Sequence, residues 1–159
     1  MKTVRGDLIE LTREGHFDVI IHGCNCFHVM GAGVAKQISD TFPEALFFDK
    51  LTSKGSREKL GTVSVADIPI GHPKFYNKYD NVHIVNAYTQ FNYGTKIQVN
   101  YEAVRSCFKT IKELYPNVNC RIGYPRIGAG LAGGDWNIIS KIIDEELQGL
   151  NHTLVEYAV

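Results

Sequence analysis

The spacing of apolar and polar residues changes several times along the 159-residue chain, which predicts strands separated by helices. We interpret residues 8–11, which are apolar except at Glu10, as a continuation of the first strand. Short apolar runs and period-two alternations predict six strands, at residues 3–5, 18–24, 61–68, 81–88, 120–124 and 153–157.

Apolar residues at helical spacing predict helices at residues 33–42, 44–51 and 98–114, and a last helix around residues 139–147. Pro43 separates the first two, because proline disfavours helical geometry in the residue before it and suits the first position of a helix. Strands alternate with helices almost throughout, which predicts an α/β fold with a mostly parallel sheet covered on both faces. At this length we expect one domain, residues 1–159.

Composition narrows the classes of partner. The 17 basic and 17 acidic residues give a formal net charge of zero, so no global field attracts nucleic acid or an acidic membrane. The first seven residues lack the apolar region of a signal peptide, and no apolar run is long enough to span a bilayer. The four cysteines show no disulfide-framework spacing. We therefore expect a cytoplasmic protein with reduced thiols.

A first glycine-containing loop, Gly31-Ala32-Gly33, lies between a predicted buried strand and a predicted helix. Glycines let backbone N–H groups approach a ligand closely, and the N-terminus of a helix favours an anion. The third glycine of the dinucleotide-binding spacing is absent, since residue 36 is lysine, and the P-loop pattern is also absent. Taken alone, this loop is interpreted equally well as a phosphate site or as a tight turn.

A second loop contains Gly128, Gly130, Gly133 and Gly134 within seven residues, which exceeds the need of a single turn. Such a run exposes N–H groups in a concavity that binds anions. Ligands of mostly parallel sheets bind beyond the carboxyl ends of the strands, where both loops are predicted to lie. The two loops together predict a site for two linked phosphates, or for a phosphate and a sugar.

Four motifs resemble the macrodomain family, in the same order and with similar separations. They are Gly6-Asp7-Leu8 and the segments 21–26 (IHGCNC), 30–35 (MGAGVA) and 125–136 (PRIGAGLAGGDW). Within that family they are similar to the ADP-ribose-1″-phosphate phosphatase-like branch, which is close to the terminal ADP-ribose–protein glycohydrolases. The resemblance implies a three-layer α/β/α macrodomain with a mixed, mostly parallel six-stranded sheet and a cleft that binds ADP-ribose.

The resemblance also implies which residues bind the ligand. Asp7, followed by Leu8, matches the carboxylate that accepts a hydrogen bond from the adenine amine. Asn25 matches the residue that is hydrogen-bonded to the distal ribose, and Tyr157 stands where an aromatic residue often flanks the adenine. The diphosphate loops comprise Gly31, Ala32, Gly33 and Val34 in the first, and Gly128, Ala129, Gly130, Leu131 and Ala132 in the second.

His22 and Asp135 match the proposed catalytic pair of the phosphatase branch. An imidazole with a pKa near neutrality and a carboxylate can share the base and acid roles in phosphomonoester hydrolysis. Without the resemblance, His22 is interpreted as a hydrogen-bonded core residue and Asp135 as the N-cap of the last helix. If the strand stays extended to Asn25, His22 and Asn25 face opposite ways, so the chain must turn at Gly23 or Cys24 for both to line one cleft.

Two further features bear on the chemistry, a candidate metal site and a lysine. Cys24, Cys26 and His28 lack the usual metal-ligand spacing, and we expect no metal and no cofactor. The related glycohydrolases use a lysine from the region of Lys96 with an aspartate that directly follows the Gly-Leu of the second loop. This sequence has Ala132 at that position, which weighs against the lysine mechanism.

The sequence thus predicts a hydrolase that removes the 1″-phosphate from ADP-ribose 1″-phosphate. An ADP-ribosyl glycohydrolase acting on protein or nucleic acid adducts, and a non-catalytic ADP-ribose reader, remain alternatives. The expected partners are ADP-ribose or ADP-ribose 1″-phosphate, together with ADP-ribosylated macromolecules. Neither membrane association nor direct nucleic-acid binding is expected.

Overall fold

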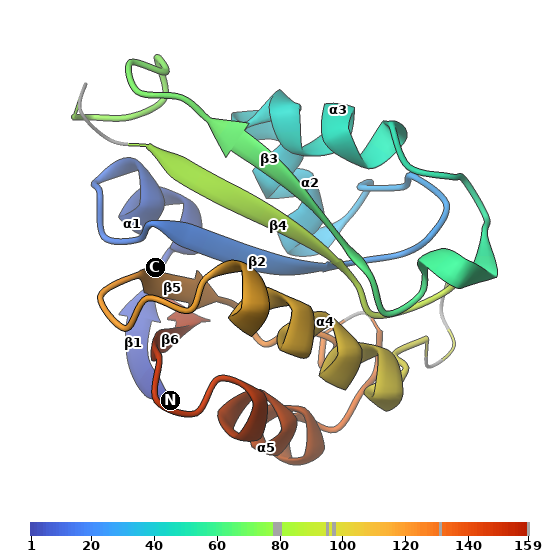
Figure 1. Ribbon diagram of the computed structural model, residues 1–159. Coiled ribbons are helices and arrows are strands. Elements are labelled where there is room, and N and C mark those ends of the chain that lie inside the picture. Colours follow the sequence, from blue (N-terminus) through green and yellow to red (C-terminus); the bar gives the residue numbers. More distant parts are fainter. Residues whose placement is uncertain (78–80, 95, 97, 131, 159) are drawn as a thin grey trace.

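The computed structural model describes residues 1–77, 81–94, 96, 98–130 and 132–158. Within these residues, six strands form one sheet in the order β1-β6-β5-β2-β4-β3 (Figure 1). Neighbouring strands are parallel except at one edge, where β3 runs antiparallel to β4. The strands are β1 (Lys2–Gly6), β2 (Val19–Cys24), β3 (Val63–Ile68), β4 (Val82–Tyr88), β5 (Arg121–Tyr124) and β6 (Asn151–Tyr157).

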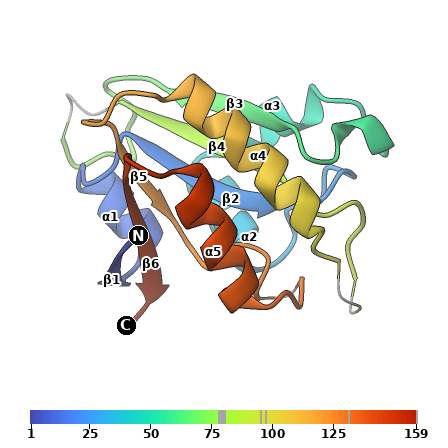
Figure 2. The same cartoon turned by 60° about the horizontal axis from the view of Figure 1, so that its bottom comes forward.

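Helices cover both faces of the sheet, which confirms the predicted three-layer α/β/α arrangement. On one face lie α1 (Leu8–Arg13), α2 (Gly33–Thr41) and α3 (Pro43–Lys50), and on the other lie α4 (Tyr101–Leu114) and α5 (Trp136–Glu146). Figure 2 shows α4 and α5 in front of the sheet. A short 3₁₀ turn, η1 (Arg57–Lys59), precedes β3. None of the described helices is long and apolar enough to cross a membrane.

Two apolar cores lie between these layers, one on each face of the sheet. In β2, Ile20 belongs to the core under α1, α2 and α3, whereas Val19 and Ile21 belong to the core under α4 and α5. This division follows from the extended backbone, whose successive side chains point to opposite faces. His22 continues the alternation and therefore lies on the same face as Ile20.

The prediction that residues 8–11 continue the first strand is wrong, because these residues begin α1. The Asp7 side chain caps this helix, with Oδ1 accepting a hydrogen bond of 3.1 Å from the Glu10 N–H. Leu8, Ile9 and Thr12 are buried on one side of the helix. The periodicity of a short apolar run cannot distinguish a strand from a helix. Here Asp7, as the capping residue, marks the start of a helix.

The helix predicted from residue 98 begins three residues later, at Tyr101, because the Asn100 side chain caps it. Asn100 Oδ1 accepts a hydrogen bond of 2.9 Å from the Ala103 N–H.

The loops after the parallel strands share one edge of the sheet and are hydrogen-bonded to one another. The Cys26 N–H, after β2, donates to the Phe91 carbonyl, after β4, at 2.9 Å. The Gln98 N–H donates to the carbonyl of Ala132 in the second glycine loop, also at 2.9 Å. The candidate site is therefore formed by loops from neighbouring strands.

Candidate ligand-binding site

The first glycine loop presents unpaired backbone donors at the start of α2. Gly31, Ala32 and Gly33 are exposed, and Gly33 has a φ of 60°, in the region that favours glycine. No described residue accepts a hydrogen bond from the N–H groups of these three residues or of Val34. Because the positive end of the helix dipole lies here as well, the loop suits an anion.

The second glycine loop closes on itself. The Gly134 N–H donates to the Gly128 carbonyl at 2.7 Å, and the Gly133 N–H donates to the Gly130 carbonyl at 3.1 Å. A Cβ at Gly128 would lie 2.7 Å from Val99 Cγ2, and one at Gly134 would lie 2.6 Å from the Gly128 carbonyl oxygen. Only glycine therefore fits at these two positions.

This loop also contains unpaired donors. Among the described residues, none accepts a hydrogen bond from the N–H groups of Gly128, Gly130 and Ala132, whereas the Ala129 N–H is bonded to the Arg126 carbonyl. Leu131, predicted to belong to this loop, lies outside the described residues. The two glycine loops thus supply two rows of backbone donors that can hold phosphate oxygens.

Asp7 and Tyr157 lie together at the β1–β6 end of the same edge. Gly6 pairs with Tyr157 in the sheet, and the Tyr157 side chain is 67% exposed. One oxygen of Asp7 caps α1. The Leu8 side chain is buried in the core, so Leu8 can offer only its backbone to a ligand. The roles of these residues at an adenine remain predictions.

Asn25 shapes the loop after β2. Its Nδ2 donates to the Val29 carbonyl at 2.8 Å, and its Oδ1 accepts from the Phe27 N–H at 2.9 Å. Only 7% of the residue is exposed. A contact between Asn25 and a distal ribose remains a prediction, and it would have to share an amide that already holds the loop.

His22 is not at the surface of the cleft. Strand β2 stays extended through Cys24, so the turn needed to bring His22 and Asn25 into one cleft does not occur. The imidazole is 1% exposed, and its Nε2 donates to Asn86 Oδ1 at 2.6 Å. Burial lowers the pKa of His22 to about 4, against the opposing effects of Asn86 and Asp49. The structure therefore gives His22 no direct contact with a ligand, and its catalytic role stays a prediction.

His22 instead belongs to a buried polar network that the sequence analysis did not anticipate. Asn86 Nδ2 donates to Ser64 Oγ at 3.1 Å, and Ser64 Oγ lies 2.8 Å from the Tyr88 hydroxyl. The Tyr88 hydroxyl donates to Asp49 Oδ1 at 2.8 Å. The available signal in the sequence was Asn86, a polar residue that interrupts the apolar run from Ile84 to Tyr88.

Asp135 is exposed and caps α5. Its Oδ1 accepts a hydrogen bond of 2.9 Å from the Asn137 N–H, and its own N–H donates to the Tyr101 hydroxyl at 3.0 Å. No described residue donates to its other carboxylate oxygen, Oδ2. Asp135 can therefore cap the helix and still offer one oxygen to a substrate or a water molecule.

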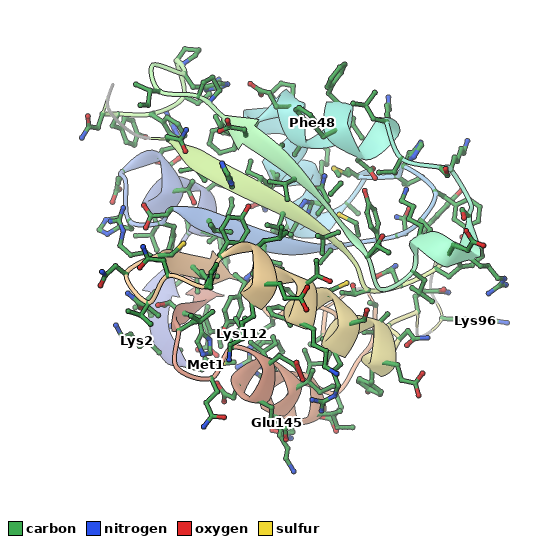
Figure 3. All side chains as sticks on the ribbon, in the orientation of Figure 1. Met1, Lys2, Phe48, Lys96, Lys112 and Glu145 are labelled. Atoms are coloured by element: carbon green, nitrogen blue, oxygen red, sulfur yellow. The ribbon has the colours of Figure 1, made fainter. Side chains whose placement is uncertain are left out.

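Two candidates from the sequence remain: a metal site at the cysteines, and Lys96. Among the described residues, no three histidine, cysteine or acidic side chains gather where they could hold a metal ion, and Cys24 and Cys26 are free thiols. The Lys96 side chain extends outward from the loop after β4 (Figure 3).

No family model matches the chain. It is 39% identical over 163 residues to an uncharacterized 17.5 kDa protein of Enterobacteria phage T4, from the tk-vs intergenic region, with 99% of this chain and 96% of the phage protein covered. The macrodomain of Mycobacterium tuberculosis DarG aligns over 97% of this chain and 95% of its own length, with a TM-score of 0.74 and 18% identity. The chain belongs to the family of the phage T4 protein and has the macrodomain fold.

A third similarity concerns a structure with a ligand. Thermosipho africanus DarTG, in complex with ADP-ribose, aligns over 100% of this chain and 42% of its own length, with a TM-score of 0.73 and 16% identity. The similarity confirms the fold expected from the four motifs. It does not distinguish the phosphatase-like branch from other macrodomains.

Proposed function

We propose that this macrodomain binds ADP-ribose along the edge formed by its strand ends, and that it hydrolyses the phosphate ester at the 1″ position of ADP-ribose 1″-phosphate. The observation that carries the proposal is the pair of glycine loops, in each of which several N–H groups find no acceptor among the described residues. The similarly folded Thermosipho protein, which is in complex with ADP-ribose, supports it.

The strand order supports an extended ligand. Asp7 follows β1, and Tyr157 is the last residue of β6. The second glycine loop follows β5, and the first follows β2. Neighbouring strands are about 4.8 Å apart, so the β1 and β2 ends are separated by roughly 14 Å. This order suits a base at one end, a diphosphate in the middle and a sugar at the other end.

Asp135 is the group we assign to the chemistry. In the proposed reaction, Asp135 takes a proton from water as the water oxygen bonds to phosphorus and the bond from phosphorus to the 1″ oxygen breaks. The proton then passes to the 1″ oxygen, which leaves ADP-ribose and inorganic phosphate as products. The N–H groups of the loops hold the phosphoryl oxygens as their charge changes. His22 acts indirectly, since its hydrogen bond to Asn86 joins β2 to β4 two residues before each of these strands ends.

A non-catalytic ADP-ribose reader is the second candidate. The burial of His22 favours it, because one member of the predicted catalytic pair has no access to a ligand. In a reader, Asp135 would serve only as the cap of α5.

A substrate panel separates the two functions. The panel contains ADP-ribose 1″-phosphate and ADP-ribose attached to glutamate, serine and a DNA base, with the released products analysed. We expect phosphate release from the first substrate. Asp135→Asn should slow it by about 100-fold or more while ADP-ribose affinity is retained, since positioned acid–base groups contribute 10²–10⁴-fold.

The substitution is chosen so that the fold is preserved, because asparagine caps helices about as well as aspartate. Asp67→Asn, in β3 and outside the site, is the matched control and should keep the wild-type rate. Binding of ADP-ribose without turnover of any substrate would exclude the hydrolase and leave the reader.

A further inference from the structure

Thr89, the first residue after β4, has a buried hydroxyl without a partner. The residue is 0% exposed, and Oγ1 makes no hydrogen bond with any described residue. The backbone of Thr89 is paired, since its N–H donates to the Ala87 carbonyl at 2.9 Å and its carbonyl accepts from the Asn100 N–H at 2.8 Å. Buried hydroxyls in folded proteins nearly always have a partner, so the missing one requires an explanation.

The position of this hydroxyl distinguishes it from the other unpartnered buried atoms in the described part of the chain. Asp49 and Lys59 face each other, with Lys59 Nζ 3.6 Å from Asp49 Oδ1, and Glu44 contacts His72 through its second oxygen at 2.8 Å. Thr89 lies instead at the edge where the loops of the candidate site begin.

Gly23, near the end of β2, packs closely between Thr89 and the second glycine loop. A Cβ at Gly23 would lie 2.9 Å from Thr89 Oγ1, 3.3 Å from Ile127 Cγ2 and 4.0 Å from the Gly128 nitrogen. The Gly128 N–H also lacks a described acceptor. Two unpaired donors, a hydroxyl and an amide, therefore lie around one point where the strand ends meet the loop.

We propose that Thr89 is a ligand-binding residue, whose hydroxyl donates to an oxygen of the bound diphosphate beside the Gly128 N–H. The inference rests on the proposed function and adds a residue to the site. Two donors at one point call for an acceptor, and a phosphate oxygen is a strong one. Because the hydroxyl is closed to solvent in the free protein, this contact requires the second loop to move when the diphosphate binds.

Thr89→Val tests the proposal, because it replaces the hydroxyl by a methyl group of nearly the same size. If the hydroxyl is unpaired until ligand binds, the variant loses no hydrogen bond in the free protein, and its melting temperature stays the same or rises. Its dissociation constant for ADP-ribose should increase by about 10-fold, the effect of losing one hydrogen bond to a charged group. These opposite effects are not expected of a structural threonine.

Three controls accompany this variant. Thr89→Ser keeps the hydroxyl and should keep most of the affinity. Thr153→Val makes the same change at a buried threonine of β6, near the amino end of the sheet, and should leave the affinity unchanged. ADP, which has the diphosphate but no distal ribose, should show the same loss as ADP-ribose with Thr89→Val.

Each alternative result identifies which statement fails. Wild-type affinity in Thr89→Val, with or without a lower melting temperature, would overturn the inference and leave the proposed function intact. A loss seen with ADP-ribose but not with ADP would overturn the assignment to the diphosphate. Absence of ADP-ribose binding by the wild-type protein would overturn the proposed function itself.

Discussion

His22 lies two residues before the end of β2, and its side chain follows the alternation of the strand rather than the direction of the cleft. The sequence motif identified a residue next to the site, but it carried no information on which face of the sheet that residue occupies. The alternation of Val19, Ile20 and Ile21 between the two cores settles the direction. The strand geometry therefore points the His22 side chain into the core, and the catalytic role implied by the motif stays a prediction.

The buried imidazole should make the stability of the protein depend on pH. The unfolded chain binds a proton at His22 near pH 6.5, whereas the folded protein binds it only near pH 4. Between these values the unfolded state holds more protons, so the free energy of unfolding falls as the pH falls, by up to about 3 kcal/mol. Urea unfolding between pH 7 and pH 4 measures this loss.

The variant His22→Asn isolates the contribution of the histidine from that of other groups. It removes the titrating side chain, so its unfolding free energy should change less over the same pH range. Parallel pH curves for the two proteins would contradict the assignment of the low pKa to His22.

At the scale of elements, the second glycine loop is the most tightly specified part of the site. Gly128 has a φ of 74° and lies against Val99, and Gly134 lies against the Gly128 carbonyl. Gly130, in the same loop, has open space where a Cβ would project and is not among the residues with positive φ. Gly128 and Gly130 therefore form a matched pair, in which the same substitution meets a clash at one position and open space at the other.

We expect Gly128→Ala to lower the free energy of unfolding by about 2 kcal/mol or more, since it combines a strained backbone with a steric clash. It should also weaken ADP-ribose binding, because the N–H donors of the loop are displaced. Gly130→Ala should leave the fold almost unchanged. Equal stability of the two variants in urea unfolding would contradict the described loop geometry.

The elements that the sequence predicted well are those with a strong pattern and clear ends. The helices predicted at residues 33–42 and 44–51 agree with α2 and α3 to within a residue at each end, because Pro43 defines their junction. The strand prediction for residues 8–11 is wrong because three apolar residues, Leu8, Ile9 and Leu11, have no decisive period. The motif predicts a ligand role for Asp7 but does not reveal its second role as the cap of α1.

At the scale of the whole molecule, the proposed anion site is compatible with a formal net charge of zero. Its donors are backbone N–H groups at a helix N-terminus and in a glycine loop, so no excess of lysine or arginine is needed. The overall composition therefore gives little information on whether such a site exists. The spacing of the glycines, and their position after parallel strands, predict where it lies. The buried network from His22 to Asp49 could not be located in this way, because it joins β2, β3, β4 and α3, which are distant in sequence.

The central claim is that ADP-ribose binds along this edge, with Asp7 at the adenine end. Isothermal titration calorimetry of the wild-type protein and of Asp7→Ser tests it most directly, because serine can still cap α1 but is too short to replace the carboxylate. We predict one ADP-ribose per chain for the wild type, and an affinity about 10-fold lower for the variant at unchanged stability. The absence of ADP-ribose binding by the wild type, or equal affinity of the two proteins, would contradict the claim.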